Sequence, residues 1–389
     1  MKKVSTIGAF LVGCLLVLFL TMPSLIRLHE LETGNAEPAK DSAPALPNTG
    51  TAASESAEIP IVPDGYKPIG AERITYNAAD AEPLPDGKKL TIGILQFMEH
   101  PSLDDIRFGM IDQLAQRGYI NGINIDIIYK NGQADQNTMK SIADQFIAQD
   151  LDILVGVATP AAQALQNAAA GQTPVIFAGI SDPVGAGLVK SLENPGQPVT
   201  GATFEPQDAA TLDLIKAIMP EAKTLGVLYN TSEQNAAQQV GNIKELAPAA
   251  GFEIKERTIT STNDLKQVAE QLAGEVDAIY VPQDNTIAGA MDTLIPATNA
   301  KGVPVFPAVD AMVSQGGLAT MGLNQYMWGA DSGTAIADVI EGADASTYPV
   351  IVSKISNQFI NSDAATALGI EIPAEVAEAA IDMAPSKAN

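Results

Sequence analysis

Five short apolar runs, each ending at a polar loop that opens into a helix-like stretch, most constrain how this chain folds. The runs lie at residues 152–157, 175–177, 225–229, 278–281 and 303–306. Apart from Asp152 at the start of the first run, they are apolar, as buried parallel strands are. The loops that follow them are Thr159-Pro160-Ala161-Ala162, Ser181-Asp182-Pro183-Val184, Asn230-Thr231-Ser232-Glu233, Asp284-Asn285-Thr286 and Val309-Asp310-Ala311. Open parallel sheets bind ligands at the carboxyl ends of their strands, so these loops predict a ligand site.

The alternation of strand and helix patterns predicts two similar α/β halves. In the first half, strands are expected at 90–95, 123–129, 152–157 and 174–177, and helices at 102–116, 137–148 and 160–170. In the second half, helices are expected at 209–218, 235–250, 263–272 and 285–299, and strands at 224–229, 253–259, 278–281 and 303–306. The fold class is therefore α/β, with two doubly wound parallel-sheet domains joined by a hinge.

The expected first domain comprises residues 89–202 plus 324–345, and the second comprises 203–323 plus 346–389. If the carboxyl edges of both sheets face one another, all five loops line one cleft between the domains. Such clefts are favoured places for small-molecule sites, and hinge closure shuts them around the ligand.

Residues 1–29 are predicted to be an export signal or a membrane anchor. Lys2 and Lys3 precede an uncharged apolar stretch at 7–26, which is long enough to span a bilayer core of about 30 Å as a helix. Its length favours an uncleaved helix. The alternative is a lipoprotein acylated on Cys14, because residues 11–14 match the pattern at which bacterial lipoproteins are cleaved. Both interpretations give a membrane-tethered domain on the extracytoplasmic face.

Residues 30–88 are rich in Ala, Pro, Glu, Ser and Thr and show no sustained period. Such a segment is typical of a flexible linker, because it cannot bury enough apolar surface to offset its ordering entropy. A second possibility is that the part between Tyr66 and Tyr76 packs on the domain. The sequence leaves both open.

Composition excludes several classes of function. A net charge of −24 would repel phosphate backbones, so no nucleic-acid partner is expected. The chain has one cysteine and two histidines, His29 and His100, too few for a Cys/His metal cage or a Cys–His nucleophile. No dinucleotide or phosphate-loop motif is present. We expect a monomeric binding protein with no catalytic residues, no metal and no cofactor.

Five stretches, at residues 94–104, 158–163, 181–189, 228–232 and 281–286, resemble one family in that order. It is the substrate-binding proteins of ABC importers in their tryptophan/tyrosine-type branch, which have the type I periplasmic-binding fold. The resemblance covers nearly all of residues 89–370. It implies an extracytoplasmic component that captures an aromatic amino acid and delivers it to a membrane permease with its ATPase. Residues 306–310 and 325–328 depart from the usual acidic-and-tyrosine pattern.

A second function remains open at this point, namely a ligand-sensing surface receptor of the same fold that signals to a membrane partner. Its binding site would look the same as that of an importer component.

The polar loops suit a zwitterionic ligand. Thr159 is expected at a helix N-cap, where its hydroxyl and the amides of Ala161 and Ala162 would hold a carboxylate. Further polar groups are expected from Ser181, Asp182, Asn230, Thr231, Ser232 and Asn285. Asp284 and Asp310 are the candidates to pair with an ammonium group. Each residue is also explained as a simple helix cap, so the prediction depends on their number.

The loop after the first strand is less polar and is expected to form the pocket for the ligand's side chain. The resemblance supports Phe97, Glu99 and His100 as contacts. A histidine before proline is also common as a structural loop residue. Phe97 is preferred over Tyr229 and Trp328 as the aromatic contact, because the latter two are equally well explained by core or hinge packing.

Overall fold

The computed structural model describes residues 62–63, 65–68, 70–84, 87–354 and 356–387. All of them belong to one compact unit, Ile59–Asn389. The expected anchor at 1–29, with Cys14, and most of the expected linker lie outside the described residues. Within the described part, no helix has the length and apolar character needed to cross a membrane.

The first lobe is built on a six-stranded parallel sheet with the order β2-β1-β3-β4-β5-β11. Its strands are β1 (Leu90–Gln96), β2 (Ile125–Asn131), β3 (Ile153–Val157), β4 (Val175–Ala178), β5 (Val199–Phe204) and β11 (Ile351–Ser353). Every residue of β3, β4 and β5 is buried. These strands are apolar on both sides because helices cover both faces of the sheet.

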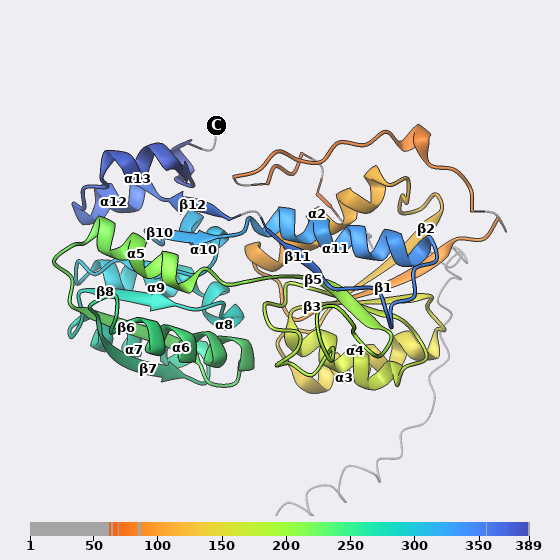
Figure 1. Cartoon of the computed structure of the whole chain (residues 1–389), viewed down its shortest axis with the longest axis horizontal. Coiled ribbons are helices and arrows are strands. Elements are labelled where there is room, and N and C mark those ends of the chain that lie inside the picture. The colour runs from red at the N-terminus through yellow and green to blue at the C-terminus, as the bar shows by residue number, and fades with distance from the viewer. Residues whose placement is uncertain (1–61, 64, 69, 85–86, 355, 388–389) are drawn as a thin grey trace, which may run out of the picture. The chain divides into compact units, whose positions relative to one another are not determined.

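Helices α3 (Gln136–Ala148) and α4 (Thr159–Ala169) cover one face of this sheet, and α2 (Pro101–Gln116) and α11 (Gln325–Ile340) cover the other (Figure 1). Helices α2 and α11 pack with their backbones almost touching. A Cβ atom added at Gly109 would lie 1.9 Å from the carbonyl oxygen of Tyr326, and one at Gly329 would lie 2.0 Å from that of Ile106. Glycine is therefore required at both crossing points.

The second lobe has a four-stranded parallel sheet with the order β7-β6-β8-β9. Its strands are β6 (Thr224–Asn230), β7 (Glu253–Ile259), β8 (Ala278–Val281) and β9 (Val305–Pro307). Two apolar cores flank the sheet. The helices around it are α5 (Asp208–Ile218), α6 (Gln234–Leu246), α7 (Leu265–Ala273), α8 (Asn285–Ala288), α9 (Met291–Asn299) and α10 (Asp310–Ser314).

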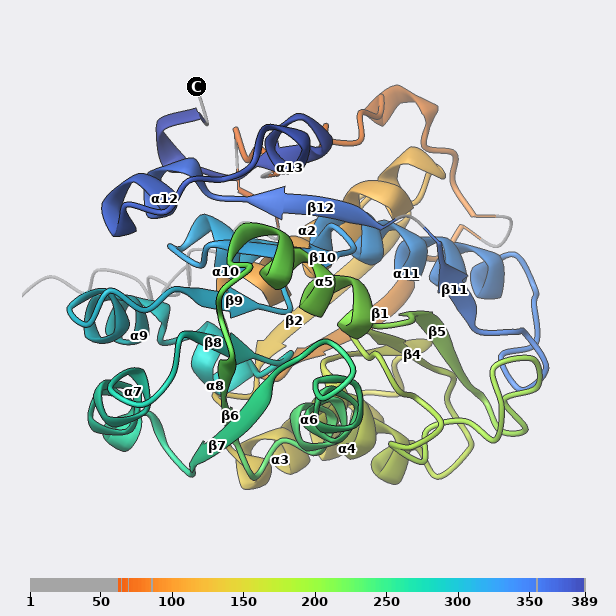
Figure 2. The same ribbon diagram turned by 60° about the vertical axis from the view of Figure 1, so that its left-hand side comes forward.

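A small sheet, β10-β12-β13, completes the second lobe beside α12 and α13 (Figure 2). Its strands are β10 (Ala319–Gly322), β12 (Asn357–Ile360) and β13 (Ala380–Asp382), and the helices are α12 (Ser362–Leu368) and α13 (Ala374–Ala379). The sequence did not predict β12, β13, α12 or α13. Short 3₁₀ turns lie at Ala78–Asp80, Thr262–Asp264 and Pro385–Lys387.

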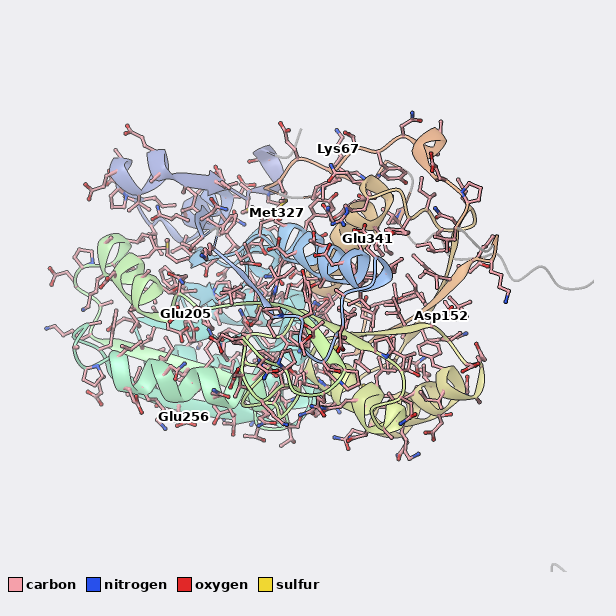
Figure 3. The ribbon with its side chains drawn as sticks, turned by 45° about the vertical axis from the view of Figure 1, so that its right-hand side comes forward. Lys67, Asp152, Glu205, Glu256, Met327 and Glu341 are labelled. Carbon is pink, nitrogen blue, oxygen red and sulfur yellow. The ribbon has the colours of Figure 1, made fainter. Side chains whose placement is uncertain are left out.

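The described chain passes between the lobes three times, from β5 to α5, from β10 to α11 and from β11 to β12. Figure 3 labels Glu205 in the first of these crossovers, and Met327 and Glu341 towards the two ends of α11. Strand β11 pairs with β5 in the sheet of the first lobe, whereas the expected division placed residues 346–389 in the second domain. The exact domain limits otherwise stay a prediction.

The architecture of two doubly wound parallel α/β lobes is confirmed. One expected helix, at 285–299, is wrong as a single element, because it is divided into α8 and α9 at Gly289 and Ala290. Gly289 closes α8 where the two lobes touch. A Cβ atom added there would lie 2.8 Å from Cε of Met98 in the first lobe.

Residues 65–68 and 70–76, here called the strap, pack on the helices of the first lobe. The Tyr66 hydroxyl donates to the Asp105 carboxylate, and its ring lies 4.5 Å from that of Phe108. The Arg73 guanidinium donates to both oxygens of the buried Asp112, at 2.7 and 3.0 Å. Of the two possibilities left open by the sequence, packing is therefore the one found for this segment.

Candidate functional site

The two sheets share one strand order, and in each the order reverses beside the first strand of the lobe. Strand β1 lies between β2 and β3, and β6 lies between β7 and β8. The loops that leave the carboxyl ends of two such neighbouring strands diverge to opposite faces of the sheet, and this leaves a crevice. The loops after β1 and β3 face those after β6 and β8, and a cavity lies between them.

Both lobes contribute to the wall of this cavity. The residues from the first lobe are His100, Ser102, Leu103, Ile106, Thr159, Gly179, Gln325 and Trp328. Those from the second lobe are Asn235, Gln283, Asp284, Asn285, Ala288 and Val309. The volume of this cavity is about 30 Å³. A cavity of this size holds water but is too small for an amino acid. The lobes are therefore closed, and a ligand of that size enters only when they separate.

One direct hydrogen bond joins the two lobes at the cavity wall. His100 precedes α2, and its Nε2 lies 3.2 Å from Oδ1 of Asn285 in the first turn of α8. Burial lowers the pKa of His100 to about 4, although the Asn285 hydrogen bond acts in the opposite direction. The imidazole is consequently neutral at physiological pH.

The helix that begins at Thr159 has an unusual start. Its N-cap is Ala158, with φ +76° and ψ 156°, and no side chain caps the helix. That conformation is normally restricted to glycine, and such strain concentrates at functional sites. The expectation of Thr159 as the N-cap is therefore wrong by one residue. Since Thr159 is the first helical residue, its hydroxyl is not used as a cap and lines the cavity.

Behind the wall formed by the second lobe lies a buried carboxylate, that of Glu233. Glu233 is buried at the start of α6, and its carboxylate accepts hydrogen bonds from the backbone N–H and Nδ2 of Asn285, at 2.9 and 2.7 Å. It also accepts the backbone N–H and hydroxyl of Thr286, at 2.8 and 2.7 Å. Burial and the charge of Glu233 raise the pKa of Asp284 well above its usual range. One negative charge therefore lies behind this wall, fully hydrogen-bonded.

Four buried polar side-chain atoms of the cavity wall have no hydrogen-bond partner in the structure. They are His100 Nδ1, Ser102 Oγ, Asn235 Oδ1 and Gln283 Nε2. Buried polar groups are nearly always paired, so the concentration of these atoms at one place marks the cavity as a candidate polar binding site.

Apolar side chains lie beside these polar atoms. Leu103 and Ile106 of α2 and Trp328 of α11 line the same cavity and are almost fully buried. The Trp328 indole is fixed, because its Nε1 donates to the Ala202 carbonyl at 3.1 Å and its ring packs edge-on against Phe204 at 4.8 Å. The site therefore combines polar groups with a rigid apolar wall.

Four of the residues predicted from sequence line the cavity, namely His100, Thr159, Asp284 and Asn285. Phe97 and Glu99, expected beside His100, do not. Phe97 packs into the core of the first lobe, and Glu99 is exposed and accepts the Tyr129 hydroxyl at 3.1 Å. The preference for Phe97 over Trp328 is reversed in the structure, because Trp328 lies at the cavity. Tyr229 instead donates to Glu256 at 2.8 Å.

Four other predicted residues, on α4 and in the turn after β4, do not line the cavity. Ala161 and Ala162 are fully buried in α4, and the Ala162 N–H donates to the Ala158 carbonyl at 3.1 Å. Asp182 accepts the Gly185 N–H at 2.8 Å within its own turn, and Ser181 lies in the same turn. None of these four residues belongs to the cavity wall.

The loop after β6 is held by hydrogen bonds within the loop and to α8. Asn230 donates through Nδ2 to Thr286 at 2.9 Å and accepts the N–H and hydroxyl of Ser232, at 3.0 and 2.9 Å. Thr231 and Ser232 are exposed. Asn230 therefore ties this loop to α8, and none of the three lines the cavity.

Asp310 does not line the cavity. It is buried, and its carboxyl accepts Nδ2 of Asn324 at 2.8 Å, the Gln325 N–H at 3.3 Å and the Ala311 N–H at 2.8 Å. Burial, with the charge of Asp105, raises its pKa to about 8. Its hydrogen bonds therefore stabilise the crossover between β10 and α11.

Sequence reasoning missed Glu233 as a site residue, and also Asn235, Gln283, Ser102 and the apolar wall. Gln283 comes two residues after a predicted strand, a position that marks it as a candidate. Glu233 gives no local signal, because its partners lie about fifty residues away. In the described part of the chain, no group of three His, Cys, Asp or Glu side chains is arranged to hold a metal ion.

Comparison with known proteins agrees with this geometry. Residues 91–384 match the model of the family described as ABC transporter substrate binding protein. A tyrosine-binding protein of Clostridioides difficile is 37% identical over 296 residues, covering 76% of this chain and 86% of that protein.

Two solved structures have nearly equal identity but different similarity in shape. An ABC domain from Streptococcus pneumoniae in complex with L-Trp is 39% identical, with a TM-score of 0.73 over 75% of this chain and 99% of that one. The ligand-free, open structure of a Clostridium difficile substrate-binding protein with adhesive properties is 38% identical, with a TM-score of 0.59 over 73% and 96%. The lower score against the open form agrees with the closed lobes described above.

The matched family consists of solute-binding proteins and not enzymes, as the composition led us to expect, and such proteins act outside the cytoplasm. The two lobes, the crossovers and the interlobe cavity are those of the type I periplasmic-binding fold. The chain therefore belongs to the family of ABC transporter substrate-binding proteins.

Proposed function

We propose that this protein captures an aromatic amino acid, tryptophan or tyrosine, between its lobes and delivers it to the permease of an ABC importer. The observation that carries the proposal is the group of unpartnered polar atoms beside a rigid apolar wall. A free amino acid has both a charged polar end and a side chain, so it satisfies both parts of this site. The relatives that bind tyrosine and L-Trp support the aromatic class.

The two ends of the ligand have distinct places in this proposal. The uncapped first turn of α4 and the Thr159 hydroxyl receive the carboxylate, because helix N-termini favour anions. The ammonium end lies on the side of the cavity where the buried Glu233 carboxylate is found. Leu103, Ile106 and Trp328 contact the ring.

Binding is tested by calorimetric titration and thermal unfolding of the chain from residue 59 onward, with a panel of amino acids. This start retains the strap. A ligand that binds only the folded state stabilises it by about 2.7 kcal/mol at a hundredfold excess over its Kd. We expect selective stabilisation by L-tryptophan or L-tyrosine. Equal responses to all amino acids, or none from a ligand-stripped sample, would contradict the aromatic assignment.

Delivery is a separate part of the proposal. A monomer tethered to the cell membrane by its N-terminal segment would present the loaded lobes to a permease and its ATPase. Uptake of labelled tryptophan and tyrosine should fall when the gene is deleted and return with the intact chain. Normal uptake, together with altered signalling in response to the amino acid, would point to a sensing receptor instead.

A further inference from the structure

The hydrogen bonds around Glu233 define which atom of each nearby side chain is a donor and which is an acceptor. Asn285 donates through Nδ2 to Oε2 of Glu233, at 2.7 Å. A carboxylate only accepts, so the amide nitrogen must point to Glu233 and the amide oxygen must point to His100. The polarity of the Asn285 amide is thereby fixed.

That polarity in turn fixes the tautomer of His100. Oδ1 of Asn285 is an acceptor, so the His100 Nε2 that lies 3.2 Å from it must carry the proton. Because burial keeps the ring neutral, Nδ1 has no proton and presents a lone pair. This Nδ1 is buried at the cavity wall and has no partner.

The same reasoning applies to Asn235 on the second lobe. Its Nδ2 donates to the carbonyl oxygen of Gln283 at 2.6 Å. Since a carbonyl oxygen only accepts, the other atom of this amide is the oxygen. Asn235 Oδ1 is likewise buried at the cavity wall without a partner.

Two neutral acceptors, one from each lobe, therefore line one small cavity in front of a buried negative charge. We propose that His100 Nδ1 and Asn235 Oδ1 receive the ammonium group of the ligand, and that Glu233 is the positioning residue that sets this polarity through Asn285. An ammonium group has three N–H donors and can satisfy both acceptors at once. Its binding then joins the lobes. This proposal rests on the proposed function and replaces the carboxylates of Asp284 and Asp310 as direct ammonium partners.

The tautomer is measured without any ligand. The full-length chain is labelled with ¹⁵N and ¹³C at histidine only, and His29→Gln removes the one other histidine signal. At pH 7 we expect the shifts of a neutral ring protonated at Nε2. A ring protonated at Nδ1, or one that exchanges between tautomers, would overturn the proposal.

The role of Glu233 is tested by the same spectrum. Glu233→Gln offers an amide to Asn285, so the amide can turn and the His100 signal should become a mixture of tautomers. Asn285→Ala provides the same readout should Glu233→Gln fail to fold. Glu275→Gln, at an exposed carboxylate of the second lobe, is the matched control. An unchanged tautomer in both site variants would show that Glu233 has no positioning role.

Binding tests the acceptors with two probes, L-tryptophan and indole-3-propionate, which lacks the ammonium group. Asn235→Leu and His100→Leu should each weaken L-tryptophan binding about ten- to a hundredfold, as loss of a charge-assisted hydrogen bond does. They should leave indole-3-propionate binding nearly unchanged. Asn263→Leu, at an exposed position, is the control. Equal losses for both probes would refute the assignment. If wild type binds neither probe, the proposed function fails, and the ligand-free spectrum still decides the tautomer.

Discussion

The starts of helices α4 and α8 occupy equivalent places in the two lobes but have opposite electrostatic character. Each follows a buried parallel strand and lines the same cavity. Helix α4 begins at strained Ala158 without a side-chain cap. Helix α8 is capped by Asp284, which accepts the Ile287 N–H at 2.9 Å, and by Glu233, which accepts the N–H groups of Asn285 and Thr286.

This difference gives the cavity a direction. In the first lobe no acidic side chain caps the start of α4, whereas in the second lobe two carboxylates accept the first amides of α8. Under the function proposed above, the carboxylate of an amino acid would lie at the start of α4, and its ammonium group between His100 and Asn235. The two helix starts therefore differ in charge, because the side chain of Glu233 reaches the start of α8 and not that of α4.

The strongest test of the comparison is to remove that glutamate. Glu233→Ala leaves the N–H and Nδ2 of Asn285 and the N–H and hydroxyl of Thr286 without their acceptor. We expect the free energy of unfolding to fall by about 3–5 kcal/mol, because buried donors remain unpaired. Urea denaturation measures this, and Glu275→Ala at the surface should change it by less than about 0.5 kcal/mol. A loss as small as that of the control would contradict the capping role.

Acid should act on the contact between His100, which precedes α2, and Asn285 in the first turn of α8. The pKa of His100 lies near 4 in the folded chain, below the ordinary value of 6.5. The unfolded chain therefore binds the proton more readily, so the stabilising contribution present above pH 6.5 is lost as pH falls towards 4. The loss amounts to about 3 kcal/mol. Wild type and His100→Gln are compared by denaturation from pH 7 to pH 4, and parallel curves would disprove a buried neutral imidazole.

The anion-binding side is tested at Thr159. Thr159→Val keeps the shape of the side chain and removes the hydroxyl at the cavity wall. Affinity for the amino-acid ligand should fall about tenfold, because a hydrogen bond to a charged group is lost. Titration calorimetry measures the change, with Thr262→Val at an exposed turn as the control. Unaltered affinity would mean that the carboxylate lies elsewhere.

The smallest effect is expected at the strained cap. Ala158→Gly relieves the positive φ of +76°, partly offset by the greater entropy of glycine in the unfolded chain. A gain of about 1 kcal/mol is expected in thermal unfolding. Ala164→Gly, within α4, should instead lose about 1 kcal/mol. Equal losses of stability in the two variants would contradict backbone strain at Ala158.

Much of the fold followed from local patterns. Strand β8 was predicted at 278–281 and is found at Ala278–Val281. A short apolar run bounded by polar residues is typical of a buried strand. Helix α11 begins at Gln325, directly after the cap residue Asn324, whose side chain accepts the Met327 N–H at 3.2 Å. The break at Gly289 was not predicted, because its reason is Met98 in the other lobe.

The candidate site divides in the same way. His100, Thr159, Asp284 and Asn285 were found from their positions after strands, and they do line the cavity. Asp310 shares that sequence pattern but is directed to the β10–α11 crossover by Asn324. The expected ligand contacts at Phe97 and Glu99 do not line the cavity, because one side chain is drawn into the core and the other into solvent.

The sequence by itself determined the two parallel α/β lobes and predicted that a small ligand binds at the polar loops between them. Hydrophobic periodicity and helix-start residues act over a few positions, so they can be read locally. Only the tertiary structure decided which loops carry which charge, which tautomer His100 adopts and which atoms remain unpaired. Those features depend on hydrogen bonds between residues that are distant in the chain, such as Glu233 with Asn285 and His100 with Asn285.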